Sequence, residues 1–260
     1  MYIKPYDELT IQDNFIFQKV MRNKRICKQT IERLLDIDIK DISYPEEEKS
    51  INVRLDSKSI RLDVYVNDDK GTIFNIEMQT TKDMDELVKR TRYYQGLIDI
   101  DNIEKGQNYS ALHDTYIIFI CTFGVFTGKR HKYTFRNLCI EDNEILLNDG
   151  TTKLFLSTKG EADDVSKPLK MFLDYVDGKK PEDALMQEID HEVDTVKHCD
   201  EWRRDYMTLA LEMDKKWREG KAEGKIEAIR NAIKDGLTTL AAVKKSGRYT
   251  EEEIAAIAAP

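Results

Sequence analysis

The 260-residue sequence predicts a mixed α/β fold rather than a repeating βαβ array. Segments 59–68 and 71–80 show alternating apolar residues on either side of a turn-prone stretch, which indicates a β-hairpin. Amphipathic segments at 13–36 and 83–101 predict helices before and after that hairpin. The almost wholly apolar segment 115–123 then predicts a strand that is buried on both faces in the middle of a sheet.

The segment 13–36 predicts one or two helices, and the segment 83–101 predicts a single helix. Basic residues separate the apolar positions of the first segment, and Asp13 is the expected cap of its N-terminus. Both predictions rest on residues that recur at helical spacing. They are Phe17, Val20, Met21, Ile31, Leu34 and Leu35 in the first segment, and Leu87, Arg90 or Thr91, Tyr94 and Ile98 in the second.

The second strand of the expected hairpin, 71–80, has two different faces because strand side chains alternate with period two. One face is apolar, as expected for a strand that packs against a core. The other carries an acid between two amides. The apolar face comprises Phe74, Ile76 and Met78, and the polar face comprises Asn75, Glu77 and Gln79.

Shorter strand signals occur elsewhere in the sequence. They lie at 37–45, 50–55, 131–140 and 151–158, with a turn expected at 148–150. The first of these segments could equally finish the preceding helix. Together with the hairpin and the apolar run, these strands complete the sheet of the expected α/β fold.

Beyond residue 160 the sequence becomes helical and acidic, and from residue 201 it predicts long amphipathic helices. Gly236 is expected to end one helix, and a short helix is expected at 238–245. Thr250 and Glu253 have the spacing of a capping box at the start of a last helix. This helix–turn–helix rhythm could read DNA, although it more often marks a small packing or dimerisation module.

The composition is that of a soluble globular protein, with 40% hydrophobic and 35% charged residues. No stretch approaches about 20 uninterrupted apolar residues, and the N-terminus lacks the pattern of a secretory signal. The four cysteines show no CxxC or zinc-like spacing, so we expect a reduced, cytoplasmic protein without disulfides. No dinucleotide or P-loop motif occurs, and the histidines are too dispersed to suggest a zinc site.

The net charge of −8 argues against non-specific coating of nucleic acid, but local basic clusters remain candidates for phosphate contact. The alternative for each cluster is an ordinary solvated surface. One cluster comprises Lys129, Arg130, His131, Lys132 and Arg136, and the other comprises Lys89, Arg90 and Arg92.

The most informative pattern joins the two strands of the expected hairpin. Asp63 points opposite to its apolar neighbours, and Glu77 and Gln79 follow on the next strand. If the strands pair, all three side chains can face the same side near one end. Two converging carboxylates offer oxygen ligands for Mg²⁺ or another divalent cation such as Mn²⁺ or Ca²⁺, which can assist phosphodiester hydrolysis. The alternative is a pair of acids on a half-solvated sheet.

Several ordered sequence blocks extend this interpretation. The stretches "DNFIFQKVM", "IRLDVYV", "GTIFNIEMQ" and "RTRYYQGLID" follow one another in the same order as in the Rpn family of recombination-promoting nucleases and transposase-like proteins. The chain resembles this branch of the PD-(D/E)xK nuclease superfamily over about residues 10–160, and its C-terminal tail resembles the common extension of the family.

The resemblance implies a restriction-endonuclease-like αβββαβ core with a mixed sheet, followed by an α-helical C-terminal extension. It implies a nuclease-like domain at 1–160, a helical connector at 161–200 and the extension at 201–260. It also implies magnesium-dependent DNA endonuclease activity, with roles in bacterial recombination, mobile elements or defence.

The resemblance further assigns roles to individual positions. Asp63 matches the motif aspartate, Glu77 the second acid, and Gln79 the site of the usual lysine. The positive charge that Gln79 lacks could come from Arg90 or Arg92 on the next helix. Asp13 matches a helix acid that supports the metal, with Glu8 as a competing candidate. Arg90 and Tyr94 match the RxxxY pattern of the helix after the motif, with a role either beside the scissile phosphate or in holding the site. The two basic clusters, rather than the resemblance, supply the expected nucleic-acid contacts, which are Arg92, Lys129, Arg130 and Lys132.

The sequence thus favours a DNA endonuclease that hydrolyses phosphodiester bonds through a bound metal ion. The alternative is a catalytically inactive DNA-binding or assembly protein of a mobile element with the same fold, because the usual lysine is replaced by Gln79. A transposase of the three-acid type is not supported by any suitable set of separated acids. We expect DNA as partner, a homodimer as a plausible assembly, and neither a membrane nor a nucleotide cofactor.

Overall fold

A computed structural model describes residues 2–44, 50–51 and 60–258. Its contacts divide the chain into two compact units, one formed by Asp7–Cys199 and the other by Met1–Tyr6 together with Asp200–Pro260. The domain boundaries expected near residues 160 and 200 stay predictions.

The larger unit is built on a mixed sheet, which contains six strands within the described residues. The strand order is β1-β4-β5-β6-β8-β7, so the apolar strand β6 lies inside the sheet as its sequence predicts. β5 pairs antiparallel with β4 and parallel with β6, and β8 is parallel to β6. The strands are β1 (Ile42–Ser43), β4 (Val64–Asp68), β5 (Ile73–Gln79), β6 (Thr115–Cys121), β7 (Lys132–Phe135) and β8 (Thr151–Ser157).

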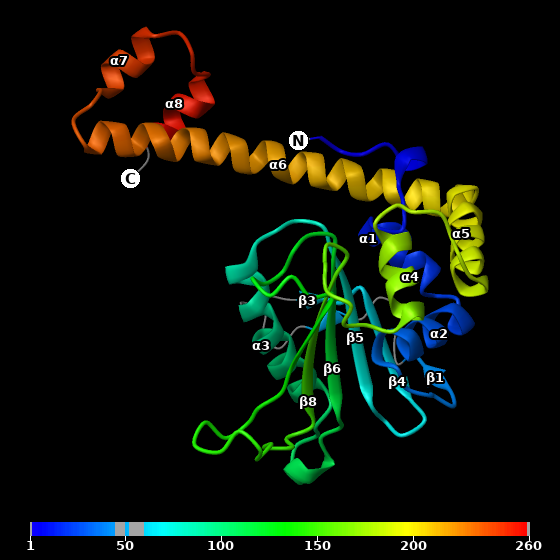
Figure 1. The fold of residues 1–260 in the computed structure, drawn as a ribbon. Coiled ribbons are helices and arrows are strands. Elements are labelled where there is room, and N and C mark those ends of the chain that lie inside the picture. Colours follow the sequence, from blue (N-terminus) through cyan, green and yellow to red (C-terminus); the bar gives the residue numbers. More distant parts are fainter. Residues whose placement is uncertain (1, 45–49, 52–59, 259–260) are drawn as a thin grey trace. The chain divides into compact units, whose positions relative to one another are not determined.

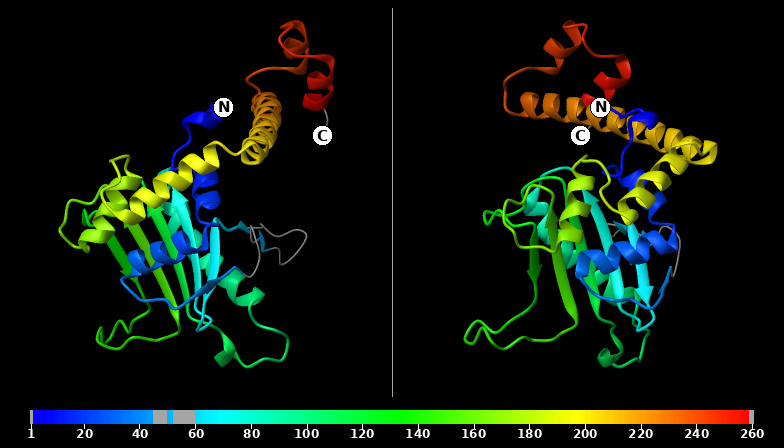
Figure 2. Two further views of the ribbon diagram at one scale, coloured as in Figure 1. Left: turned by 90° about the vertical axis from the view of Figure 1, so that its right-hand side faces the viewer. Right: turned by 45° about the vertical axis from the view of Figure 1, so that its right-hand side comes forward.

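Helices cover both faces of this sheet. Helix α3 lies on one face, whereas α2 and α4 lie on the other, as Figures 1 and 2 show. The segment 13–36, for which one or two helices were expected, forms two, α1 and α2, which are separated by a short turn. The helices of this unit are α1 (Asn14–Val20), α2 (Lys24–Leu35), α3 (Met84–Asp101), α4 (Lys167–Val176) and α5 (Ala184–Lys197), with a 3-10 turn at Tyr109–Ala111. Another 3-10 turn, Tyr6–Glu8, includes the boundary between the two units at Tyr6 and Asp7.

The face of the sheet under α3 is an aromatic core. Leu87, Tyr94 and Ile98 of α3 pack on it, as their helical spacing predicts. The ring centroids of Phe119 and Phe155 lie 5.7 Å apart in this core. Because residues of β5 with odd numbers share this face, Asn75, Glu77 and Gln79 point towards α3. This alternation places the polar side chains of β5 against the aromatic core.

The expected hairpin is present, but its first strand is interrupted. The segment 59–68 forms β3 (Ile60–Arg61) and β4, and Leu62 and Asp63 lie between them. The backbone N–H of Asp63 donates to Glu77 Oε1 at 3.2 Å, and the N–H of Met78 donates to Asp63 Oδ2 at 3.2 Å. Side-chain oxygens therefore take the place of ladder carbonyls where the two acids meet.

The shorter strand predictions mostly hold. The segment 37–45 contains β1, and 131–140 contains β7. The expected strand at 50–55 is described only at β2 (Ser50–Ile51), which pairs with β3, and the rest of it lies outside the described residues. Asp13 is the cap position of α1 but gives no side-chain cap bond. Its Oδ2 instead accepts from Thr10 N at 2.7 Å, so the expected capping interaction was wrong.

The smaller unit contains one long helix, α6 (Asp200–Lys234), where several helices were expected. Gly236 follows it with φ of 75°, in agreement with a glycine stop. Two short helices come next, α7 (Leu240–Lys245) and α8 (Glu251–Ala258). Thr250 and Glu253 exchange both bonds of the predicted capping box, at 2.9 and 3.1 Å. No helix in the described part of the chain is long and apolar enough to cross a membrane.

Candidate active site

The polar face of β5 is buried at the end where Asp63 meets it. Asn75 is 0% exposed and Glu77 is 3% exposed, although neither residue type is usually found inside a protein. Both lie within a strand that also buries Phe74, Ile76 and Met78 on its other side. A carboxyl group at such a position needs specific partners, because burial of an unpaired charge is costly.

Backbone N–H groups hold Asp63 and Glu77 side by side. Glu77 Oε1 accepts from Asp63 N, while Asp63 Oδ2 accepts from Met78 N on the same strand as Glu77. The two acids, 14 residues apart in sequence, therefore converge across the hairpin as its pairing predicts. The prediction that Asp63, Glu77 and Gln79 can face one side near one end of the hairpin agrees with this geometry.

Arg90 of α3 joins this polar face from above the sheet. Its Nη2 lies 3.4 Å from Glu77 Oε2, and its Nη1 donates to Gln79 Oε1 at 3.0 Å. Nη2 also donates to the hydroxyl of Tyr94, one turn later, at 2.8 Å. The guanidinium carbon lies 5.3 Å from the centroid of the Phe119 ring beneath it. The side chain is thus fixed by contacts with three polar residues and one aromatic ring.

The pKa of Glu77 reflects its burial beside a second carboxylate. Burial raises the pKa of Glu77 well above its usual value, and the neighbouring charge of Asp63 raises it further. The bonds from Asp63 N and Asn75, together with Arg90, act in the opposite direction without cancelling this effect. A further positive charge beside the two acids would relieve their repulsion.

Arg90 and Tyr94 keep their protons at neutral pH. Burial lowers the pKa of Arg90, but Tyr94 and Glu77 raise it by more, so the guanidinium stays charged. Burial, followed by the charge of Glu77, raises the pKa of Tyr94 to about 12. Burial also raises the pKa of the nearby Cys121 thiol to about 12, which makes it a poor nucleophile.

Gln79 does not present a free amide to this site. Its Oε1 accepts from Arg90, and its Nε2 donates to the carbonyl of Thr81 at 2.8 Å. The positive charge at this end of β5 therefore comes from Arg90 of the following helix. A sequence comparison restricted to the strand would miss this charge, because it lies 11 residues downstream of Gln79.

Two amide residues near the acids were not predicted as site residues. Gln18 Nε2, on α1, donates to Asp63 Oδ1 at 2.7 Å. When the Asn75 amide is oriented to donate, its nitrogen lies 3.1 Å from Glu77 Oε1 and 3.3 Å from the carbonyl of Val64. The position of Asn75 on the polar face was a usable signal, whereas nothing in the helical pattern marked Gln18.

The two carboxylates of Asp63 and Glu77 fit a hard divalent cation that takes only part of its ligands from the protein. Mg²⁺ typically binds through one or two carboxylates and keeps several waters or phosphate oxygens. The described residues contain no group of three or more His, Cys, Asp or Glu side chains arranged to hold a metal. Asp13 contacts Thr10 instead, and Glu8 is exposed in the preceding 3-10 turn. Their support of a metal stays a prediction.

The expected nucleic-acid contacts occupy different surroundings. Arg92 is exposed on α3. Lys129 is paired with Glu161 at 2.8 Å, and Arg130 lies 3.8 Å from Asp164. Lys132 donates to the carbonyl of Leu34 in α2, on the side of the sheet opposite to Glu77, and burial lowers its pKa.

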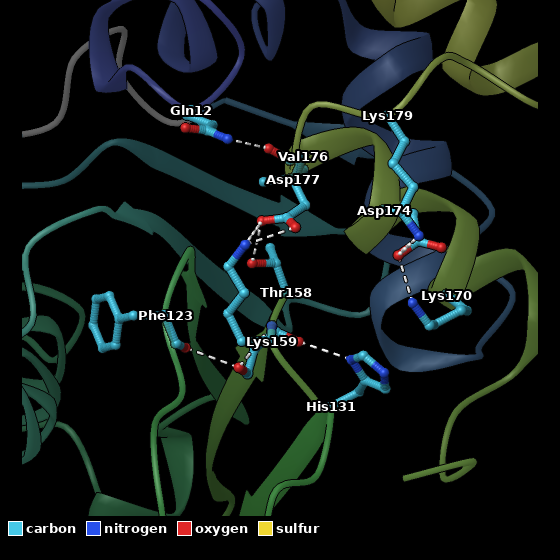
Figure 3. Close-up of polar contacts among 11 residues, drawn as sticks. Gln12, Phe123, His131, Thr158, Lys159, Lys170, Asp174, Val176, Asp177 and Lys179 are labelled. Atoms are coloured by element: carbon cyan, nitrogen blue, oxygen red, sulfur yellow. Dashed lines mark hydrogen bonds and ion pairs between the residues drawn. The ribbon is translucent and has the colours of Figure 1, made fainter. Parts of the chain in front are cut away.

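Another polar cluster lies just after the end of β8. Lys159 contacts Asp177 at 2.7 Å, and Thr158 donates to the same carboxylate at 2.9 Å (Figure 3). Each of these groups has a protein partner. This cluster contains a single acid, Asp177, which ties the turn after β8 to the end of α4, so it lacks the two converging acids of the β5 site.

A family comparison accords with this geometry. The model of a family described as PD-(D/E)XK nuclease family transposase matches residues 14–158, which is more than half of the chain. The chain belongs to this family. The matched segment of this PD-(D/E)XK protein begins at α1 and ends just after β8, so it contains Asp63, Glu77 and Arg90. The predicted family and the α/β nuclease-like fold are thereby confirmed.

Family membership supports a nuclease or transposase-like role for this PD-(D/E)XK protein, with DNA as the expected substrate of a nuclease. Nucleases of this superfamily generally use divalent metal ions. No curated protein and no solved structure matches the chain.

Proposed function

We propose that this PD-(D/E)XK protein is a metal-dependent DNA endonuclease. Its proposed active site, which hydrolyses phosphodiester bonds, contains Asp63 and Glu77. The observation that supports it best is the meeting of two carboxylates and one guanidinium at a buried end of β5. Stability does not require such an arrangement, because burying acids side by side raises the pKa of Glu77 and costs free energy. Sites of this kind are typical of catalysis.

In this proposal Asp63 and Glu77 bind the divalent cation, preferably Mg²⁺, through their carboxylate oxygens. The bound cation supplies positive charge to the phosphate and lowers the pKa of water, which is the nucleophile. Because the two acids repel each other in the metal-free protein, metal binding also relieves an electrostatic cost. No covalent bond to the protein is formed in this hydrolysis.

Arg90 acts as the fixed positive charge of the proposed site. It stays protonated, and its contacts with Gln79, Tyr94 and Glu77 hold the guanidinium in place before substrate binds. A preorganised cation stabilises the charge that develops on the phosphate in the transition state. Gln79 then orients Arg90 rather than replacing a lysine directly.

Tyr94 acts as a hydrogen-bonding group in this proposal and not as a base. Its oxygen accepts from Arg90, and its pKa of about 12 keeps its proton in place near neutral pH. The remaining O–H can donate to a phosphate oxygen. Tyr94 thus both supports Arg90 and contributes a donor of its own.

Plasmid nicking tests the proposal. Supercoiled DNA is incubated with Mg²⁺ and the wild-type chain, with Asp63→Asn, or with Asp68→Asn as a matched control on the same hairpin. Asp68 accepts from Lys70 N and Thr72 N in the turn, a role that asparagine can also fill. We expect nicking by wild type and Asp68→Asn and none by Asp63→Asn or with chelator.

Nicking that persists in Asp63→Asn or in the presence of chelator would overturn the proposal. DNA retention by the wild-type chain, without nicking under any divalent metal, would instead favour the inactive DNA-binding or assembly protein. A homodimer remains part of the prediction, since two sites acting together suit double-strand cleavage. Light scattering of the full chain measures its molar mass in solution and so distinguishes a monomer from a homodimer.

A further inference from the structure

Helix α1 contributes a side chain to the carboxylate pair. Gln18 Nε2 donates to Asp63 Oδ1 at 2.7 Å, across 45 positions of sequence and in a partly buried setting. The helix also packs against β5, the strand that carries Glu77. The Asp63 carboxylate is therefore contacted from a helix as well as from its own hairpin.

The two oxygens of Asp63 receive donors from different directions. Oδ1 accepts from Gln18 on α1, and Oδ2 accepts from Met78 N on β5. Rotation of an aspartate carboxylate about its terminal torsion is broad, so a single donor would leave its plane poorly defined. Among the described residues, these donors approach Oδ1 and Oδ2 separately and so fix that plane. A carboxylate oxygen carries two lone pairs, so accepting a hydrogen bond is compatible with binding a cation.

The chemical nature of Gln18 suits this task. A carboxamide donates a strong hydrogen bond without a charge, so it orients Asp63 without competing with a cation for its negative charge. An acid at this position would add a third negative charge beside Asp63 and Glu77. Asn75 gives Glu77 a comparable uncharged donor at 3.1 Å, so each carboxylate is contacted by one amide side chain.

We propose that Gln18 is a positioning residue that holds the Asp63 carboxylate in the orientation that binds the divalent cation. This inference rests on the proposed function, because it assumes that Asp63 is a ligand. It makes α1 part of the site, although α1 carries no residue in direct contact with the cation. Groups that orient a metal ligand in this way typically change metal affinity by about 10–100-fold when they are removed.

Calorimetric titration of the full chain with Mn²⁺ tests the inference through binding rather than through activity. Gln18→Met keeps the length of the side chain and removes the donor. Gln12→Met is the matched control, because Gln12 lies just before α1 and its Nε2 donates to the carbonyl of Val176 in α4 rather than to an acid of the site (Figure 3). We expect the Kd for Mn²⁺ to rise by about 10–100-fold in Gln18→Met. In Gln12→Met it should stay within about 2-fold of wild type, because that amide contacts neither acid.

The dependence of nicking on Mn²⁺ gives a second readout. If Gln18 only positions Asp63, the rate of Gln18→Met at saturating Mn²⁺ returns to within a few-fold of wild type, whereas the half-saturating concentration rises. A general structural defect would lower the rate at every metal concentration and lower the melting temperature. That outcome would overturn the inference.

The outcomes separate this inference from the proposed function. Equal Mn²⁺ affinity in Gln18→Met and Gln12→Met, with affinity lost in Asp63→Asn, would overturn the role of Gln18 and leave the metal site intact. Absence of Mn²⁺ binding by the wild-type chain would overturn both. Weakened binding confined to Gln18→Met and Asp63→Asn supports both.

Discussion

The acidic end of β5 and the basic segment 129–136 differ in how far their charged side chains are exposed to solvent. Glu77 is 3% exposed and shares its surroundings with Asp63 and Arg90. By contrast, the side chains of Lys129 and its partner Glu161 are 68% and 66% exposed. Water screens the exposed pair, whereas the buried groups interact in a medium of low dielectric.

The difference shows why charge density alone is a poor guide to function. The basic segment has more charged residues than β5. Its closest ion pair, between Lys129 and Glu161, is exposed to solvent. The β5 site has few charges, but the fold forces them together and raises the pKa of Glu77. Charges that are buried against one another at an energetic cost are the stronger indication of a functional site.

The largest effect should come from Glu77→Gln. This change keeps the size of the side chain and removes one proposed metal ligand, so we expect the rate of plasmid nicking to fall by at least about 10²–10³-fold. Glu161→Gln, the control from the exposed ion pair with Lys129, should stay within about 2-fold of wild type, because Glu161 is exposed and belongs to no proposed ligand or DNA-contact set. A Glu77→Gln rate within about 10-fold of wild type would contradict the contrast between the two regions.

Arg90→Met should have the next largest effect, with a loss of about 10²-fold in nicking rate, because it removes the fixed positive charge. The double variant Arg90→Met with Gln79→Lys restores a cation to the end of β5. Partial recovery of the rate in the double variant would show that charge at this place matters more than the element that supplies it. Equal nicking rates in wild type and Arg90→Met would contradict the proposed role of Arg90 in the active site.

A smaller effect is expected on the pH dependence of stability in the metal-free protein. Because folding raises the pKa of Glu77, the folded state binds more protons than the unfolded state above the ordinary glutamate value. The free energy of unfolding contributed by Glu77 is therefore highest at acidic pH and is lost as pH rises towards the folded pKa.

Urea unfolding with chelator at several pH values measures this slope. Glu77→Gln should remove it and stabilise the metal-free chain at the alkaline end by about 1–3 kcal/mol, because a buried charge is replaced by a neutral amide. If the slope is unchanged in Glu77→Gln, another group accounts for it. Lys129→Gln serves as the control and should retain the slope.

The smallest effect should come from breaking the exposed ion pair. Glu161→Gln removes the partner of Lys129, and we expect the free energy of unfolding to change by less than about 1 kcal/mol. Its nicking rate should equal that of wild type. A large loss of either would mean that the basic segment has a role that its exposure does not indicate.

Local pattern was sufficient for much of the fold. Alternation along 71–80 predicted β5, the apolar run predicted the interior strand β6, and helical spacing predicted α3. Each of these signals depends only on which face of an element is buried. The break at Asp63 was not predictable in this way, because it depends on bonds to Glu77 and Met78 that form only when the strands pair.

The sequence by itself determined which residues could share a face: Glu77 with Gln79 on β5, and Tyr94 with Arg90 on α3. It determined these relations because the period of a strand or helix is a local property. Only the tertiary structure decided that Arg90 supplies the charge beside Gln79 and that Gln18 contacts Asp63. Those contacts join residues that are far apart in the chain, and they depend on how helices pack on the sheet.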